Sequence, residues 1–350
     1  MKGYIREIFS TPLELVTKGQ INFGTFDKAF SKINLLEAKK LFGFPIPLFL
    51  KKMRLKEWQA FQFWTEDFFI LMAVYNPKSI SINQLLIFNR KTKQFYKYEK
   101  KTAFWKTKIS ENLINGFSEF VAKNFKLHVF NELEKNRIKI EIDIKKFKTY
   151  PDFEADIEIV NPESKNKPII VSIPFGKNRG MYSHKELSGI QGVIKLGSKI
   201  INLKPENSFA IFDDHKGYYP YNMKYDWVTA ANYVNDELVG FNLTDNQSVN
   251  SEKFNENGLW KGNQLYLLPP VKFIRPNGVN KEWIIRDDRG QVELSFFPVQ
   301  KNNFRFNLIA VKSDYYGPFG YFKGFIKYSP GKKVIVDDFF GMGEKKFIRS

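Results

Sequence analysis

The segment "NRIKIEIDIKKF", residues 136–147, alternates apolar and charged side chains. Isoleucine occupies every second position from 138 to 144, and lysine or an acid stands between. Successive side chains of a β-strand point to opposite faces, so this pattern predicts a strand with one buried and one solvated face. The segment "FEADIEIV", residues 153–160, repeats the alternation after a short polar link at Pro151. The two segments therefore predict an antiparallel hairpin.

Similar strand-like runs continue to the C-terminus and are separated by turn residues such as Gly, Pro and Asp. Short strands at this spacing are typical of sandwiches and barrels. We expect an all-β fold of two tandem antiparallel β-barrels with a few short helices, divided into domains 1–195 and 196–350. The helices are expected at 110–124, where Ser110 can cap an apolar stripe, and near 32–41. A barrel of about eight to ten strands has no sheet edges and can enclose one small ligand.

The composition is that of a folded protein without disulfide bonds. The chain has 350 residues, of which 43% are hydrophobic and 36 are Phe, enough to form a sizeable core and to exclude disorder. It has no cysteine, which excludes a disulfide framework, a thiolate metal site and a cysteine nucleophile. No apolar run reaches the roughly 18 residues of a membrane helix, and the first residues lack the apolar core of a signal peptide. We therefore expect a cytoplasmic protein.

The formal net charge of +18 suggests an anionic partner. Basic proteins often meet nucleic acids or anionic lipid surfaces. The lysines lie mostly within strand-like alternation and are not concentrated in one arm or one helix, so we do not expect nucleic-acid binding. Peripheral contact with an anionic membrane surface remains an expectation.

Several common catalytic motifs are absent from the sequence. It contains no GxxxxGK[ST], no strand–GxGxxG–helix unit, no GxSxG and no HExxH. The three histidines, His128, His184 and His215, are far apart, so a metal site would need carboxylates from elsewhere in the chain. We expect neither a metal nor a cofactor.

The segment "AIFDDHKGYYPYNMKYDW", residues 210–227, is the main candidate for a functional site. Asp213 follows an apolar strand; if it faces inward, burial raises its pKa and suits it to proton transfer. His215 stands nearby, and imidazole is suited to acid–base chemistry. In the alternative interpretation, Asp213 accepts backbone N–H groups in a turn that ends at Gly217, and His215 is exposed.

Aromatic and polar residues near this segment are candidates for ligand contacts. The aromatic rings can line a pocket or form part of the core, and a buried Asn between apolar neighbours must reach either a partner or a ligand. The candidates from this reasoning are Tyr219, Tyr221, Trp227, Asn242, Glu256 and Asn257.

These segments resemble the DUF2804 family, whose function is unknown. The resemblance covers most of the chain and is strongest from Tyr182 to Lys261. It rests on the pairs and runs Tyr182-Ser183, Gly192-Val193, Asp213 followed by Gly-Tyr-Tyr-Pro-Tyr, Asp226-Trp227, Gly240-Phe241-Asn242-Leu243 and Glu256-Asn257, and on the aromatic run Trp58, Phe61, Phe63 and Trp64. Asp226 therefore joins the candidate catalytic residues, and Tyr182, His184 and Trp64 join the candidate ligand contacts.

The DUF2804 family is in turn similar to the carotenoid hydratase, AttH and survival-factor lipocalin-like proteins, which have two lipocalin-like (calycin) barrels in tandem. This resemblance implies a lipocalin-like double barrel and a long apolar ligand, a lipid or isoprenoid. The hydratases carry a segment similar to "AWxDHEWG". An alignment without gaps keeps Ala210, Asp213 and Gly217 but places Asp214 at the His position and Lys216 at the Trp position. This chain therefore has only some of the residues found in the corresponding hydratase segment, and the hydration site of that family is not intact here.

Three functions are compatible with these patterns. The first, which we favour, is binding or carrying of an apolar ligand in a barrel. The second is a cofactor-free hydratase or isomerase, with Asp213 or Asp226 as acid and His215 or a tyrosine as its partner. The third is a structural protein whose barrels are filled by side chains.

Overall fold

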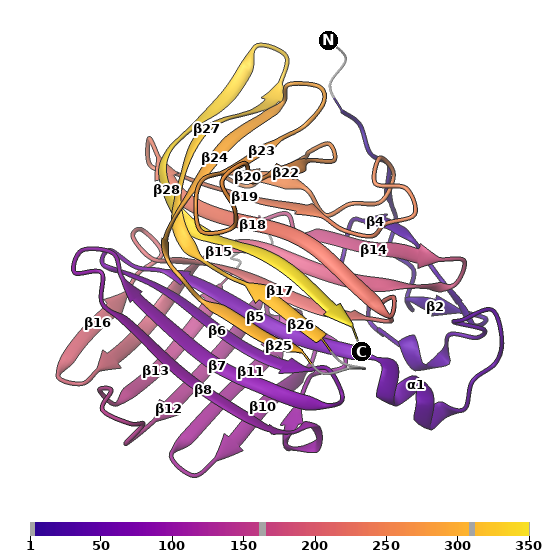
Figure 1. Ribbon diagram of the computed structural model, residues 1–350, viewed down its shortest axis with the longest axis horizontal. Coiled ribbons are helices and arrows are strands. Elements are labelled where there is room, and N and C mark those ends of the chain that lie inside the picture. The colour runs from indigo at the N-terminus through magenta and orange to yellow at the C-terminus, as the bar shows by residue number, and fades with distance from the viewer. Residues whose placement is uncertain (1–3, 161–165, 308–311, 350) are drawn as a thin grey trace.

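Two large β-sheets make up most of the molecule (Figure 1). The structure is a computed structural model that describes residues 4–160, 166–307 and 312–349. One sheet has 15 strands and the other has 11, and neighbouring strands pair antiparallel except for β1, which pairs in parallel with β4. The first sheet curves into a nearly closed barrel, so the all-β double barrel predicted from the sequence is confirmed.

The first sheet follows the order β8-β7-β6-β5-β17-β15-β13-β12-β11-β10-β9, with β1, β4, β14 and β16 attached beside this path. Its strands are β1 (Ile8–Phe9), β4 (Gly24–Phe26), β5 (Lys56–Trp64), β6 (Phe68–Asn76), β7 (Ile80–Asn89), β8 (Phe95–Ala103), β9 (Thr107–Lys108), β10 (Gly116–Ala122), β11 (Phe125–Glu132), β12 (Arg137–Ile144), β13 (Phe153–Val160), β14 (Ile169–Gly176), β15 (Arg179–Leu196), β16 (Lys199–Leu203) and β17 (Phe209–Gly217).

The second sheet follows the order β21-β20-β19-β18-β28-β27-β24-β23-β22, and β25 and β26 join it through β28. Its strands are β18 (Asn222–Val234), β19 (Glu237–Asp245), β20 (Gly258–Lys261), β21 (Gln264–Leu267), β22 (Lys272–Ile274), β23 (Trp283–Arg286), β24 (Val292–Gln300), β25 (Asn303–Asn307), β26 (Lys312–Tyr316), β27 (Phe319–Ser329) and β28 (Lys332–Arg349). The short strands β2 (Val16–Thr17) and β3 (Gln20–Ile21) form a separate pair. The chain passes from the first sheet to the second between Gly217 and Asn222, after the expected domain boundary at residue 195; that boundary stays a prediction.

Helices are short in the described residues. They are α1 (Leu48–Arg54) and the 3₁₀ turns η1 (Leu35–Glu37), η2 (Phe104–Lys106) and η3 (Leu133–Lys135). The helix expected at 110–124 is wrong, because β10 occupies much of this range and pairs in register with β11. Near 32–41 the structure has η1 alone. No helix in the described ranges is long and apolar enough to cross a membrane.

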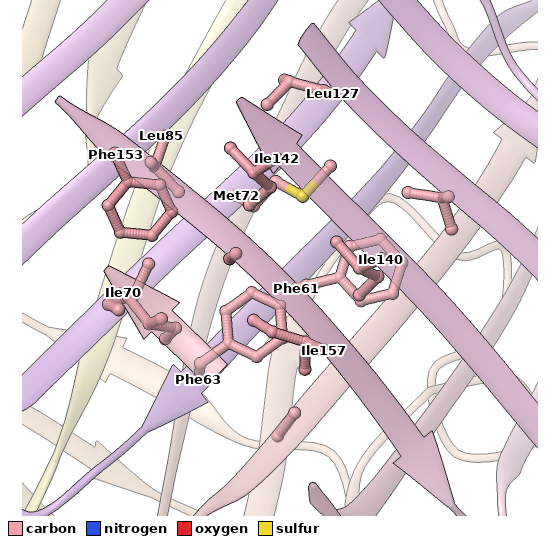
Figure 2. Close-up of a cluster of buried hydrophobic side chains, with 14 of the residues drawn as sticks. Phe61, Phe63, Ile70, Met72, Leu85, Leu127, Ile140, Ile142, Phe153 and Ile157 are labelled. Atoms are coloured by element: carbon pink, nitrogen blue, oxygen red, sulfur yellow. The ribbon is translucent and has the colours of Figure 1, made fainter. Parts of the chain in front are cut away.

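The hairpin predicted from residues 136–160 is confirmed as β12 and β13. Ile140 pairs with Ile157 across the two strands, and both side chains are buried. Figure 2 shows them meeting Phe61 and Phe63 of β5 inside the first barrel. The alternating isoleucines therefore supply one wall of a packed barrel core.

Three hydrophobic clusters define the layers of the molecule. The first fills the interior of the first barrel, and a second, which includes Phe241, Trp283 and Phe322, is the core of the second sheet. A third cluster lies between the two sheets, where Trp64 and Phe69 of the first meet Phe340 of the second. This contact layer between the sheets positions the candidate site.

We predict that Ile140→Ala lowers the free energy of unfolding by about 2–5 kcal/mol, because it leaves a cavity in a close-packed core. Ile335→Ala is the matched control, since Ile335 is 53% exposed on β28. Urea unfolding followed by circular dichroism measures both. An equal loss in the two variants would show that the first barrel is not filled as described.

Candidate functional site

A cavity of about 170 Å³ lies between the two sheets. Strands β5, β6, β15 and β17 of the first sheet form one wall, and β18, β26 and β28 of the second form the other. None of the residues that line it belongs to the two barrel cores. The cavity thus differs in position from the ligand site that we expected inside a barrel.

Strand β17 explains why charged groups reach this cavity. All nine of its residues are buried, because one face covers the barrel core and the other faces the second sheet. Ala210 and Phe212 belong to the barrel core, whereas Phe209 and Ile211 belong to the layer between the sheets. The period-2 alternation then brings Asp213 to the cavity.

The register of the first sheet places a lysine directly beside this carboxylate. Asp213 pairs with Lys185 on β15, and Lys185 Nζ lies 2.7 Å from Asp213 Oδ2. Glu256 Oε2 lies 3.6 Å from the same Nζ, and His215 Nδ1 lies 3.5 Å from Asp213 Oδ1. All four side chains are less than a tenth exposed, so a lysine, two acids and a histidine form one buried cluster.

The opposite charges in this cluster stabilise each other's ionised forms. Burial alone raises the pKa of Asp213, but the attraction of Lys185 and His215 outweighs it and holds the pKa below its usual range. Burial likewise opposes the charge on Lys185, but Asp213 and Glu256 outweigh it and raise the pKa of that ammonium. The pair is therefore ionised, and Asp213 is a carboxylate at neutral pH.

Aromatic rings form the walls around the cluster. Trp58 stacks on Tyr219 with ring centres 5.8 Å apart and contacts the His215 ring at 4.3 Å. Trp227 lies on the other side, with Lys185 Nζ 5.5 Å from its ring centre. Flat faces of this kind suit an aromatic or unsaturated ligand.

A second lysine, Lys346 of β28, enters the cavity from the opposite sheet. Its Nζ lies 4.9 Å from the Tyr75 ring centre and 3.0 Å from the Tyr225 hydroxyl. In the described part of the chain no carboxylate oxygen is within 4.0 Å of this Nζ; nearby Glu344 accepts a hydrogen bond from Tyr315. Burial lowers the pKa of Lys346, and the more distant charges of Glu344 and Asp213 offset this only in part.

Several polar atoms of the cluster have no hydrogen-bond partner among the protein atoms described. They are Asp213 Oδ1, His215 Nδ1 and Glu256 Oε2. Buried polar atoms are usually satisfied, so unsatisfied atoms beside a cavity are natural contacts for a ligand or for water. Neither here nor elsewhere in the described ranges are three His, Asp or Glu side chains grouped so that they could hold a metal ion.

The family model of DUF2804, a domain of unknown function, matches residues 6–349. The chain belongs to the DUF2804 family. A search of curated proteins finds no match.

Among solved structures, the chain is similar to the crystal structure of CghA, with a TM-score of 0.50 and 10% identity over 85% of this chain and 88% of that one. It also matches kievitone hydratase from Nectria haematococca, with a TM-score of 0.48 and 11% identity over 84% of this chain and 89% of that one. At such identity the likeness to CghA concerns the fold alone.

The structure brings five of the candidate residues together at the cavity, namely Asp213, His215, Tyr219, Trp227 and Glu256. In the alternative interpretation Asp213 lay in a turn and His215 was exposed. This alternative is wrong, because both lie within β17 and both are buried.

Two further candidates support the cavity without lining it. Asn242 accepts a hydrogen bond from Trp227 Nε1 at 2.6 Å and donates one to the Glu256 carbonyl at 2.8 Å. Asn257 accepts a hydrogen bond from the Thr244 backbone N–H at 2.7 Å and donates to the Pro269 carbonyl. Their buried amides therefore position neighbouring residues.

The remaining candidates lie elsewhere. Asp226 pairs with Arg275 at 2.7 Å, and burial raises its pKa although Arg275 opposes this. Tyr221 is exposed, and Trp64 donates to the Phe340 carbonyl between the sheets. Tyr182 and His184 lie on β15 at positions that alternate with Lys185, where the Tyr182 hydroxyl is 3.4 Å from His184 Nδ1. None of these five side chains lines the cavity.

The cavity also contains three residues that no sequence pattern marked as candidates, namely Lys185, Lys346 and Tyr75. Because the chain is rich in lysine, the presence of one lysine in the sequence does not indicate a functional residue. The alternation within β15 shows which lysine faces inward only once its pairing with β17 is known.

We predict that Asp213→Asn destabilises the protein at neutral pH by up to about 3–5 kcal/mol, because Lys185 then keeps Glu256 as its one nearby acid. The folded pKa of Asp213 is below its unfolded value of about 3.9, so its contribution is full above that pH and disappears as pH falls through the folded pKa. The difference between wild type and variant, measured by urea unfolding from pH 7 to pH 3, should therefore shrink in acid.

Asp156→Asn serves as the control, because Asp156 is 61% exposed and its contact with Lys139 lies at the surface. It should stay within about 1 kcal/mol of wild type at every pH. A difference for Asp213→Asn that grows in acid would contradict the assigned ion pair.

Proposed function

We propose that this protein binds a compact aromatic or unsaturated molecule with an anionic group in the cavity between the sheets. The observation that carries the proposal is Lys346, a half-buried lysine whose amine lies in the cavity wall with no carboxylate partner within 4.0 Å in the described residues. An ammonium removed from water is costly unless it is paired. An anionic ligand group would supply the missing partner.

The two lysines of the cavity differ in charge balance. Lys185 is neutralised by Asp213 and faces Glu256 as well, so a second anion there would be repelled. Lys346 has the Tyr225 hydroxyl and the faces of four aromatic rings around it. The ligand's anion is therefore expected at Lys346, and its neutral polar atoms at the unsatisfied atoms of Asp213, His215 and Glu256.

The size of the cavity argues for a compact ligand. A cavity of about 150 Å³ is known to accommodate one benzene ring, and this one has about 170 Å³. We therefore favour a ring with a short side group over the long lipid or isoprenoid suggested by the family resemblance. Trp58, Tyr75 and Tyr219 offer ring faces for stacking.

We predict saturable binding of cinnamate, which combines one ring, a conjugated double bond and a carboxylate. Lys346→Met removes the amine but keeps the length of the side chain, and it should weaken binding about tenfold or more. Ala73→Phe places a ring inside the cavity and should block binding. Quenching of tryptophan fluorescence and isothermal titration calorimetry measure the affinity.

Two variants serve as controls for these changes. Lys332→Met removes an exposed lysine, and Ala103→Phe adds a ring to a half-buried position that does not line the cavity. Both should bind cinnamate as wild type does. If wild type does not bind, or if all four variants bind equally, the proposal fails and the structural role with filled barrels is favoured.

A second candidate function is the addition of water to a double bond of such a ligand, supported by the unsatisfied atoms of His215 and Asp213 beside the cavity. In this reaction water oxygen bonds to the β-carbon of cinnamate and a proton bonds to the α-carbon, giving 3-hydroxy-3-phenylpropanoate. Asp213 is held as a carboxylate, so His215 is the proton carrier in this scheme and Asp213 its positioning partner.

Hydration removes the conjugation of cinnamate, so loss of its ultraviolet absorbance follows the reaction. If the chain is a hydratase, His215→Gln should abolish turnover while cinnamate binding persists. Binding by wild type without any loss of absorbance would exclude hydration of this probe and leave the binding function.

A further inference from the structure

Helix α1 and the loop before it carry an exposed apolar surface. Five large apolar side chains are 40–64% exposed within ten residues of one another: Phe44, Leu48, Phe49, Leu50 and Met53. No residue of α1 itself is buried. We call these five residues the α1 surface. Exposed apolar residues that occur singly are normal, but a contiguous group of them usually marks an interaction site.

The charge around the α1 surface is entirely basic in sequence. From Lys39 to Lys56 there are six Lys or Arg residues and no Asp or Glu. Lys39, Lys40 and Lys52 are exposed, whereas Lys51 donates a hydrogen bond to the Leu36 carbonyl. An apolar surface flanked by basic side chains is complementary to an anionic bilayer, where apolar groups enter the interface and each nearby cation adds about 1 kcal/mol.

We propose that the α1 surface docks this protein on anionic membranes. A second copy of the chain is a poorer partner, because each copy carries a formal net charge of +18 and the same basic residues. In Figure 1, α1 lies at the outer edge of the molecule, and none of its residues is buried, so its side chains are accessible to a bilayer surface.

The docking surface is also connected to the cavity. Arg54 at the end of α1 donates a hydrogen bond to the Tyr219 carbonyl at 3.4 Å, and the Tyr219 side chain lines the cavity. Strand β5 starts directly after α1 at Lys56 and carries Trp58 into the cavity wall. A protein docked through α1 therefore holds this end of the cavity near the bilayer. The docking itself does not depend on the proposed ligand.

The test is co-sedimentation of the full chain with vesicles of phosphatidylcholine, with and without phosphatidylserine. Wild type should bind the vesicles that contain phosphatidylserine and should dissociate as salt is raised. The double variant Leu48→Ser/Phe49→Ser should lose at least about tenfold in vesicle affinity, since both side chains are exposed and their loss leaves the core intact.

Ile335→Ser removes an equally exposed apolar side chain from β28 and should bind vesicles as wild type does. Circular dichroism confirms that each variant is folded, and cinnamate binding by the double variant separates a failure of docking from a failure of the proposed ligand site. The proposal is overturned if phosphatidylserine does not increase vesicle binding by wild type, or if the double variant still binds vesicles. It is also overturned if gel filtration shows that wild type instead self-associates through α1.

Discussion

The ion pair between Lys185 and Asp213 is the interaction on which the layer between the sheets depends. It joins the neighbouring strands β15 and β17 at a point where both are buried. Hydrophobic side chains fill the rest of this layer, so an unpaired charge here would be severely destabilising. Because Asp213 and Lys185 neutralise each other's charge, the two sheets can pack closely and still keep a polar cavity between them.

Alternate side chains of β17 face two different interiors, the core of the first barrel and the layer between the sheets. Phe212 and Ala210 belong to the barrel core, whereas Asp213 and His215, one and three residues after Phe212, line the cavity that faces the second sheet. Lys346 approaches from that sheet, and among the described residues no carboxylate oxygen lies within 4.0 Å of its amine. The cavity is therefore built by residues from both halves of the chain, and neither barrel alone would form it.

The sequence predicts those elements whose apolar pattern is sufficient by itself. Its predictions fail where pairing with another strand determines the structure. The hairpin β12–β13 follows from alternating isoleucines that need no other part of the chain. In the segment 110–124 the apolar residues also fit a helical period, but pairing with β11 selects a strand in which Phe120 is buried and Val121 exposed. Asp213 and His215 could be selected from the sequence because they lie in one polar, aromatic segment. Lys185 and Lys346 could not, because strand pairing brings them to the cavity and the sequence does not predict that pairing.

A crystal structure of the protein with cinnamate tests the account most directly. We expect the ring against Trp58 and Tyr75 in the cavity between the sheets, with the carboxylate within hydrogen-bond distance of Lys346 Nζ and both barrel cores unchanged. Cinnamate bound inside either barrel, or bound with its carboxylate away from Lys346, would contradict the assignment of this cavity as an anion-binding ligand site.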